Sequence, residues 1–316
     1  MRQVVLGAGP LGVSLERILE AAGHDVDLYS IMGNRAYDMP GTTPRAIDGA
    51  NADAVTSACA DATVMYLCLN AHYVDWYELF PPRLDAAIQT ATRTGAKLVY
   101  HDTIHRFEPG PDPMTETTPP LARTKKGRLR SGMAATFLDS LAASDIRGAI
   151  GRSADMYGPG ALNSSFNSTL GQRHFYPLLA GKAVSVVGDI DAPHTYAFVD
   201  DVAHGLTILG NRDEAPGKTW HLPAAPTLTH RQLMQLAFEV AGLPPKIRGS
   251  RISGLAVRAI GRFNGDVGEV AEILDQFERP LILSHQAFAD TFGADPTPHR
   301  TALRTTLQWY EANPLP

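Results

Sequence analysis

Hydrophobic and polar positions in the first thirty residues follow two different periods. Residues 4–6 (Val-Val-Leu) form a short apolar run, which predicts a strand buried on both faces. After the glycine-rich residues 7–12, apolar side chains recur at helical spacing, and residues 26–30 predict a second strand. A strand, a helix and a strand in this order form a βαβ unit, so we expect a parallel sheet.

The same alternation continues to about residue 150. The predicted strands are residues 63–69, 97–101 and 147–150, and the predicted helices are residues 82–94 and 129–141. Between residues 107 and 120, five prolines exclude regular structure and predict a surface loop. The fold class expected from this order is α/β, with a Rossmann-type doubly wound parallel sheet.

From about residue 155 the alternation becomes irregular, which indicates a second domain. We predict that residues 1–155 form a dinucleotide-binding domain and that residues 198–224 return to its sheet. Residues 156–197 and 225–316 are expected to form a smaller, mixed α/β substrate-binding domain.

Two helices in the second half of the chain begin with capping signals. Asp200 is predicted to cap a helix that ends at Gly210. Thr229 and Gln232 have the spacing of a capping box, in which each side chain bonds a backbone N–H of the other residue.

Composition and charge narrow the class of protein. Hydrophobic residues make up 44% and charged residues 19% of the chain, as in an ordinary globular protein. A net charge of -5 gives no attraction to nucleic acid or to an anionic membrane, and neither is an expected partner. Cys59 and Cys68 form no disulfide or zinc pattern, and no apolar run suits a signal peptide or a membrane span. We therefore expect a cytoplasmic protein.

The glycine-rich turn, residues 7–12, is the strongest chemical signal. It follows a predicted strand directly and opens a predicted helix, as the dinucleotide-binding fingerprint requires. The first glycine permits the tight turn, the second lets the backbone approach a pyrophosphate, and the third allows close packing of helix and strand. The helix N-terminus then offers free N–H groups to the phosphates of NAD or NADP. The predicted cofactor contacts are Gly7, Gly9, Pro10, Leu11 and Gly12.

The end of the second predicted strand carries no acidic residue, although an acid at this position commonly binds the ribose of NAD. Tyr29 and Ser30 occupy the position, and Asp27 lies earlier, on the strand itself. Ser30 leaves room for a 2′-phosphate and Arg35 would attract it, which favours NADP over NAD. A role for Arg35 as an ordinary solvated loop residue explains the sequence equally well.

Several segments together resemble the short-chain dehydrogenase/reductase superfamily, in particular its extended or atypical branch of NAD-dependent epimerase/dehydratase-like proteins. The segments are residues 7–12, 51–53, 69–71, 97–103, 152–160 and 196–203. The resemblance implies that Asp53 contacts the adenine, and that Leu69 and Asn70 lie beside the cofactor. It also implies that Thr103 binds the reacting oxygen, with a small-molecule substrate enclosed between the two domains.

The catalytic Tyr-x-x-x-Lys of this superfamily is incomplete here. Lys125 and Lys126 stand where the lysine is expected, but Leu121 and Ala122 stand four residues earlier. The resemblance implies that Lys126 contacts the nicotinamide ribose, whereas the tyrosine that exchanges a proton with the reacting oxygen is missing. Carbonyl chemistry therefore needs a different proton donor.

Tyr157 and His105 are the candidate replacements for the tyrosine. Tyr157 lies on the segment expected to fold over the nicotinamide, although packing is an alternative role. His105 follows the end of a strand, where open α/β sheets bind ligands, and histidine titrates near neutral pH; a place on the polar rim is its alternative role. His194 and Tyr196 are expected on the substrate side. His101 and His105 straddle a strand end rather than a helix face, so we expect no metal site.

These features predict an NAD(P)-dependent oxidoreductase that acts on a small carbonyl or alcohol substrate. Two alternatives stay open: an NAD(P)-dependent epimerase or dehydratase, and a non-catalytic regulator that senses the ratio of oxidised to reduced cofactor. The presence of Lys126 and of a large second domain favours an enzyme. The resemblance is also compatible with a homodimer.

Overall fold

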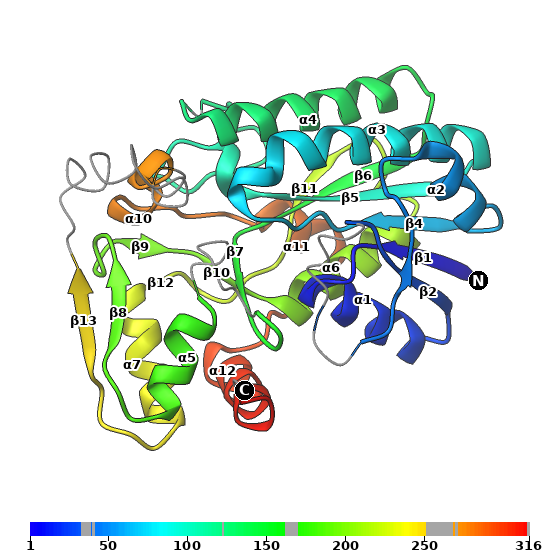
Figure 1. The fold of residues 1–316 in the computed structure, drawn as a ribbon. Helices are drawn as coiled ribbons and strands as arrows, with labels where there is room; N and C mark the ends of the chain where they lie inside the picture. Colours follow the sequence, from blue (N-terminus) through cyan, green and yellow to red (C-terminus); the bar gives the residue numbers. More distant parts are fainter. Residues whose placement is uncertain are drawn as a thin grey trace.

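A computed structural model gives the fold of the chain (Figure 1). It describes residues 1–32, 39, 42–121, 123–161, 170–250, 268 and 271–314. In these ranges the chain forms a large sheet covered by helices on both faces, with a smaller unit beside the carboxyl ends of the strands.

The large sheet has seven strands, and every neighbouring pair is parallel. Its order is β11-β6-β5-β4-β1-β2-β3. The strands are β1 (Arg2–Leu6), β2 (Asp25–Ser30), β3 (Arg45–Ala46), β4 (Val64–Leu67), β5 (Lys97–Thr103), β6 (Gly148–Ser153) and β11 (Thr219–His221). The predicted doubly wound parallel sheet is confirmed.

Helices cover both faces of this sheet. One face packs against α1 (Pro10–Ala21) and α6 (Val199–Asn211), and the other against α2 (Ala52–Ala58), α3 (Trp76–Thr94) and α4 (Lys125–Ala142) (Figure 1). Adjacent residues of β1 belong to different cores, because successive side chains of a strand point to opposite faces. This double burial explains why the central strands appear in the sequence as unbroken apolar runs.

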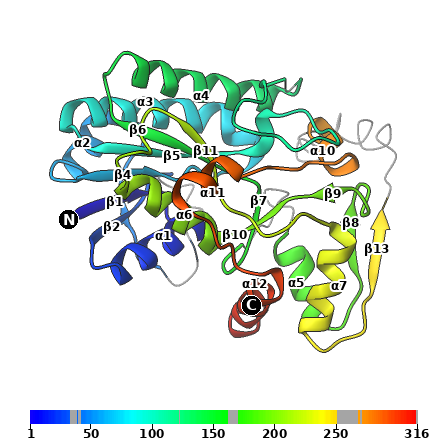
Figure 2. The same cartoon turned by 180° about the vertical axis from the view of Figure 1, so that it is seen from behind.

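In the described residues the second unit contains short strand pairs and several helices, among them the short α10 (Asp275–Glu278) (Figure 2). The strand pairs are β7 (Asp155–Tyr157) with β10 (Tyr196–Phe198), β8 (Val184–Val187) with β13 (Ile247–Ser250), and β9 (Pro193–His194) with β12 (Leu228–Thr229). The longer helices are α5 (Gln172–Leu179), α7 (His230–Val240) and α12 (His299–Ala312). One apolar core runs from α1 and α6 into this unit, so the two units share buried surface.

Two segments that follow the first 155 residues pack on the large sheet. Strand β11 pairs with β6, and α6 covers the face beside α1. Helix α11 (Gln286–Phe292) packs against β11, where the Phe288 and Trp220 rings lie 6.4 Å apart. The C-terminal segment therefore contacts the sheet as well as the second unit.

The structure corrects two predicted helix starts. Helix α3 begins at Trp76 rather than at Pro82, and two prolines lie inside it, because burial of Trp76 and Phe80 holds its first turns in place. Helix α6 has Phe198 at its N-cap, and Asp200 lies in its first turn, where its carboxylate pairs with Arg17 of α1 at 2.8 Å. The predicted capping box of Thr229 and Gln232 is confirmed at the start of α7.

Among the helices that the structure describes, none combines the length and the apolar character needed to cross a membrane. The long helices α3 and α4 are amphipathic surface helices of the sheet, with charged residues on their outer faces.

Candidate functional site

A cleft lies at the carboxyl ends of the central strands, where parallel α/β sheets place their ligand sites. Its empty volume, including the part open to solvent, is about 900 Å³. The glycine turn after β1, the ends of β4 and β5, strand β7 and one side chain of α4 all contribute to its walls. The cleft therefore brings together residues as far apart in the sequence as Gly9 and Val199.

The glycine turn has the geometry that close packing demands. Gly7 has a φ of +125°, and a Cβ there would lie 2.1 Å from the carbonyl oxygen of Cys68. A Cβ on Gly12 would lie 1.8 Å from the carbonyl oxygen of Gly7. Gly9 is the N-cap of α1 and is followed by Pro10, so the N–H groups of Leu11 and Gly12 fall in a first turn that offers them no helical acceptor. Both residues line the cleft, which suits an anionic group.

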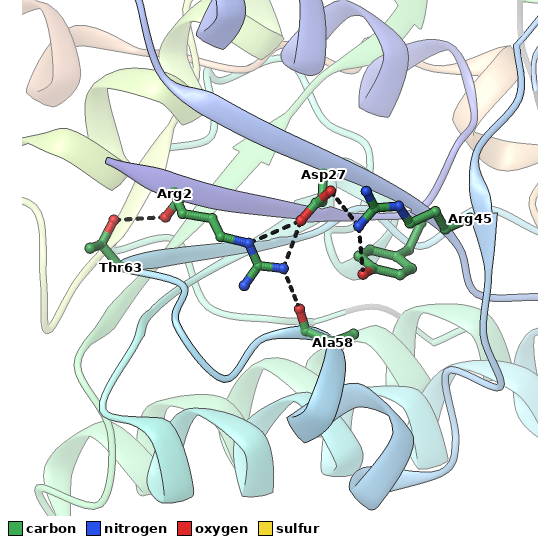
Figure 3. A network of polar contacts seen from close by, with 6 residues as sticks. Arg2, Asp27, Arg45, Ala58 and Thr63 are labelled. Carbon is green, nitrogen blue, oxygen red and sulfur yellow. Dashed lines mark hydrogen bonds and ion pairs between the residues drawn. The ribbon is translucent and has the colours of Figure 1, made fainter.

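The acidic residue near the end of β2, Asp27, is held by two arginines. Asp27 lies within the strand and forms ion pairs of 2.6 Å with both Arg2 and Arg45 (Figure 3). Ser30 is buried, and its carbonyl oxygen accepts the N–H of Ile47 at 3.0 Å. Arg35, which we expected near a 2′-phosphate, lies outside the described residues.

Three further predicted cofactor contacts differ in their positions. Leu69 and Asn70 line the cleft directly beyond β4, next to the glycine turn. Asp53 lies elsewhere: it is on α2, its side chain is 88% exposed, and it pairs with Arg93 of α3 at 2.7 Å. The structure thus places Asp53 on the outer surface and not in the cleft.

Thr103 is the last residue of β5 and lines the cleft. Its hydroxyl Oγ1 is buried, and no hydrogen-bond partner for it occurs in the described ranges. A buried hydroxyl without a partner costs stability, so this atom is suited to meet a ligand oxygen. The oxygen-binding role of Thr103 stays a prediction.

His105 lies in the short 3-10 helix after β5 and also lines the cleft. Its Nδ1 is 2.7 Å from Oε1 of Gln276, while Nε2 of the same amide donates to the carbonyl oxygen of His105 at 3.4 Å. An amide oxygen only accepts, so Nδ1 carries the hydrogen and Nε2 is the basic nitrogen. Burial lowers the pKa of His105, more than Asp155 and the Gln276 hydrogen bond raise it. At neutral pH the ring is therefore a neutral base.

Lys126 has a partner away from the cleft. It lies in the first turn of α4 with its side chain fully buried, and its Nζ is 2.9 Å from Oε2 of Glu272. The backbone N–H of Lys126 donates to Oε1 of the same carboxylate at 2.9 Å. Leu121 precedes the helix and is 64% exposed, and Ala122 lies outside the described residues. The cleft walls do not include Lys126.

Arg130 is a cleft residue that sequence reasoning missed. It lies one turn after Lys126 on the same face of α4, and it lines the cleft. Its guanidinium stands 4.4 Å from the ring centre of Trp76 and 4.6 Å from that of Phe80. The missed signal is its helical phase, because Arg130 shares a face with the apolar residues Met133, Ala134 and Phe137.

The Tyr157 ring lines the cleft, but its hydroxyl points to α12. It donates to Nδ1 of His299 at 3.0 Å, because Nε2 of that ring donates to the carbonyl oxygen of Pro226 at 2.9 Å. Burial raises the pKa of Tyr157 far above its ordinary value. Of the two predicted replacements for the tyrosine, His105 is the better candidate for proton transfer. Its ring is a neutral base at neutral pH, whereas the Tyr157 hydroxyl is bonded to His299 and has a raised pKa.

Asp155 is a second cleft residue that the sequence did not reveal. Its Oδ2 accepts from Nε2 of His194 at 2.8 Å. Tyr196 stacks on His194 with ring centres 4.6 Å apart, and its hydroxyl lies 3.2 Å from Nδ1 of His230. The predicted substrate contacts His194 and Tyr196 therefore stand behind Asp155, in a smaller hollow of the second unit.

Comparison with known proteins gives matches by structure. No protein-family model and no curated protein sequence matches the chain. The dTDP-glucose 4,6-dehydratase of Bacillus anthracis, solved in complex with NAD, is 14% identical, with 99% of this chain and 97% of that chain covered and a TM-score of 0.79. The UDP-glucose 4-epimerase of Thermus thermophilus, solved with NAD, is 16% identical, with 99% and 100% covered and a TM-score of 0.76.

These similarities show the fold of the chain, which is the fold of the extended dehydratases and epimerases. The α/β fold that the resemblance implies is confirmed. The similarity extends over both units, because nearly the whole of each chain is covered.

Proposed function

We propose that this chain is an NAD(P)-dependent enzyme that oxidises or reduces a small alcohol or carbonyl substrate in the cleft. The observation that carries the proposal is the shared wall: the glycine turn, Thr103 and His105 line one cleft at the carboxyl edge of the sheet. The glycine turn suits a pyrophosphate, because the first residues of α1 line the cleft and their N–H groups have no helical acceptor.

A bound nicotinamide supplies the capacity to accept or return a hydride. The residues of the chain then handle the oxygen and the proton. The Thr103 hydroxyl hydrogen-bonds the substrate oxygen, and Nε2 of His105 takes the hydroxyl proton while the carbon loses its hydride and the C–O bond becomes C=O. In the reverse direction the protonated His105 returns that proton to the oxygen.

A second candidate function is that of an epimerase or dehydratase, in which the hydride is taken and returned in one catalytic cycle. The structural similarity to a dTDP-glucose 4,6-dehydratase and a UDP-glucose 4-epimerase favours it. The two candidates differ in one measurement: an oxidoreductase accumulates NAD(P)H in proportion to product, and an epimerase or dehydratase does not.

Cofactor binding is the first test. We expect NADH or NADPH to bind the purified protein, measured by cofactor fluorescence, and Gly9→Asp to weaken the affinity at least tenfold, because a carboxylate would meet the pyrophosphate. Gly132→Asp is the matched control: this glycine is exposed on α4 with open space around it, and its variant should bind normally.

The outcomes separate the three readings of the sequence. If neither cofactor binds, the enzyme and the redox-sensing regulator are both excluded. If Gly9→Asp binds as well as the parent, the glycine turn is not the cofactor site. If binding is intact but a broad screen of alcohols, carbonyl compounds and sugar nucleotides gives no turnover, the regulator is the better reading.

A further inference from the structure

A buried cluster of unequal charge lies beneath the cleft. Arg130 of α4 and Arg152 of β6 share the single carboxylate of Asp102: Nη1 of Arg130 is 3.8 Å from its Oδ1, and Nε of Arg152 is 3.0 Å from its Oδ2. All three side chains are at most 2% exposed. Two guanidinium groups against one carboxylate leave one buried positive charge, which is costly without a further anion.

The neighbouring histidines do not remove this excess. Burial, and to a smaller extent the charge of Arg130 or Arg152, lowers the pKa of both His101 and His221 to about 3, so both rings are neutral. Burial alone would raise the pKa of Asp102, but Arg152 and Arg130 hold it below the usual value, so the carboxylate stays ionised. The excess charge therefore persists at neutral pH.

The cluster also has unused hydrogen-bonding atoms. Within the described ranges, Nε of Arg130, Nη2 of Arg152 and the Thr103 hydroxyl are buried without a hydrogen-bond partner. The Arg130 guanidinium lies against the neighbouring rings of Trp76 and Phe80, and both Arg130 and Thr103 line the cleft. A planar, fixed guanidinium beside a hydroxyl is suited to bind a carboxylate.

The position of the cluster indicates which anion it binds. Strand β5 is separated from β1 by β4, so its end lies roughly 10 Å from the glycine turn, two strand spacings along the sheet. The pyrophosphate belongs at the glycine turn, and Arg130 lies with Thr103 and His105, where the proposed reaction takes place. The other carboxylate of the cleft, Asp155, bonds Nε2 of His194 and is near enough to His105 to raise its pKa.

We propose that Arg130, with Thr103 beside it, binds a carboxylate of the substrate, and that the substrate class is a hydroxy acid or the corresponding oxo acid. This inference rests on the proposed function and narrows its substrate. The acid group fills the cluster's deficit of negative charge, and the adjacent C–OH or C=O group then lies beside His105. Arg130 also takes the place expected for the superfamily's lysine as the cation of the cleft, one turn after Lys126.

The test is a calorimetric titration with three hydroxy acids of different size, lactate, malate and mandelate, each compared with its neutral amide. The protein is loaded with NADH or NADPH, so that the acid cannot be oxidised. We expect at least one acid to bind tenfold more tightly than its amide. Arg130→Met should lower that affinity at least tenfold, and Arg130→Lys should restore part of it, because it keeps the charge without the planar fork.

Arg128→Met is the matched control, since Arg128 is an exposed arginine two residues earlier on α4 and lies off the cleft. It should leave acid binding unchanged. If no acid is preferred over its amide, or if Arg130→Met binds the acids as well as the parent, the inference is overturned. If Arg130→Met weakens binding of the cofactor rather than of the acid, Arg130 serves the cofactor and the inference is likewise overturned.

Two additions keep the test decisive. If Arg130→Met does not fold, as judged by circular dichroism, Thr103→Val removes a hydroxyl from the same wall and should still weaken acid binding severalfold. The titration is also run without cofactor. Acid binding that depends on Arg130 in a protein that binds neither NADH nor NADPH would leave the carboxylate site standing and exclude the proposed function alone.

Discussion

At the scale of single residues, one wall of the cleft carries two buried polar atoms without a hydrogen-bond partner in the described ranges. Buried hydroxyl and guanidinium groups are normally hydrogen-bonded, since an unpaired one costs stability. Oγ1 of Thr103 and Nε of Arg130 depart from this rule on one wall, whereas Nη1 of Arg130 donates to the Tyr100 hydroxyl at 3.3 Å. His105 completes that wall with a basic nitrogen fixed by Gln276. The same three side chains thus supply a donor, a positive charge and a proton acceptor.

The protonation of His105 leads to a pH prediction. Burial is the main cause that lowers the pKa of His105 below the ordinary value of about 6.5. The neutral base form is therefore present at about pH 6.5 and above, and it is lost as the pH falls through the lowered pKa. The rate of alcohol oxidation should be constant above about pH 6.5 and decline at lower pH. His105→Gln should lose about a hundredfold in kcat and also lose this decline, while its affinity for the cofactor stays unchanged.

Initial rates between pH 5 and 9 on an alcohol found by the substrate screen check this prediction. Tyr157→Phe is the comparison, because the Tyr157 hydroxyl is bonded to His299. A tenfold or larger loss in Tyr157→Phe with full activity in His105→Gln would transfer the proton-donor role to Tyr157.

Residue by residue, the sequence predicts the parts of the site that are adjacent to strand ends. Thr103 and His105 follow β5, Asn70 follows β4, and all three line the cleft. The helical phase of Arg130 was its only sequence signal, because its burial depends on aromatic residues of α3 that are about fifty positions away in the chain. A basic residue in a basic segment normally predicts a solvated surface.

At the scale of elements, β1 and α1 form the unit on which the cofactor site depends. Gly12 lies in the first turn of α1, where its Cα meets the carbonyl of Gly7. The close approach sets the direction of the helix N-terminus toward the cleft. Any side chain at this position pushes helix and strand apart, so the effect on stability and on cofactor binding should be coupled.

A pair of glycine-to-alanine changes tests this coupling. Gly12→Ala should destabilise the protein by about 2 kcal/mol or more, because its Cβ would lie 1.8 Å from the Gly7 oxygen. Gly132→Ala, inside α4 with open space around it, should stabilise by about 0.5–1 kcal/mol through the better helix propensity of alanine. Urea unfolding gives both values, and equal effects of the two changes would contradict the crowding at Gly12.

The strands of the large sheet were predictable from the sequence where burial on both faces alone decides their position. Apolar runs bounded by glycine or polar residues predict the five strands β1, β2, β4, β5 and β6 near their observed places. The start of α3 is wrong in the prediction, because Pro82 resembles a helix start in the sequence. Packing of Trp76, Leu79 and Phe80 against the sheet holds the earlier turns, and contacts of this kind are invisible in the local sequence.

At the scale of the whole molecule, the two units are joined by a core that also buries several histidines. His101, His174 and His221 are each at most 9% exposed. Burial is the main cause that lowers the pKa of His101 and His221 to about 3 and that of His174 to about 4. In the unfolded chain a histidine ring takes up its proton near about pH 6.5. In the folded protein these three rings stay neutral until the pH is much lower.

This difference predicts that acid weakens the whole fold before its carboxylates titrate. Because the unfolded state binds more protons than the folded state between about pH 6.5 and 4, the free energy of unfolding should fall as the pH is lowered through that window. Each of these three histidines contributes up to about 1.4 kcal/mol per pH unit, and His105 and His230, whose pKa values burial also lowers, act in the same direction. Urea unfolding at pH 7, 6 and 5 measures the slope, and a stability that stays constant from pH 7 to 5 would contradict the prediction. His174→Leu should reduce the slope by the contribution of one histidine, up to about 1.4 kcal/mol per pH unit, whereas His204→Gln at an exposed position of α6 should leave it unchanged.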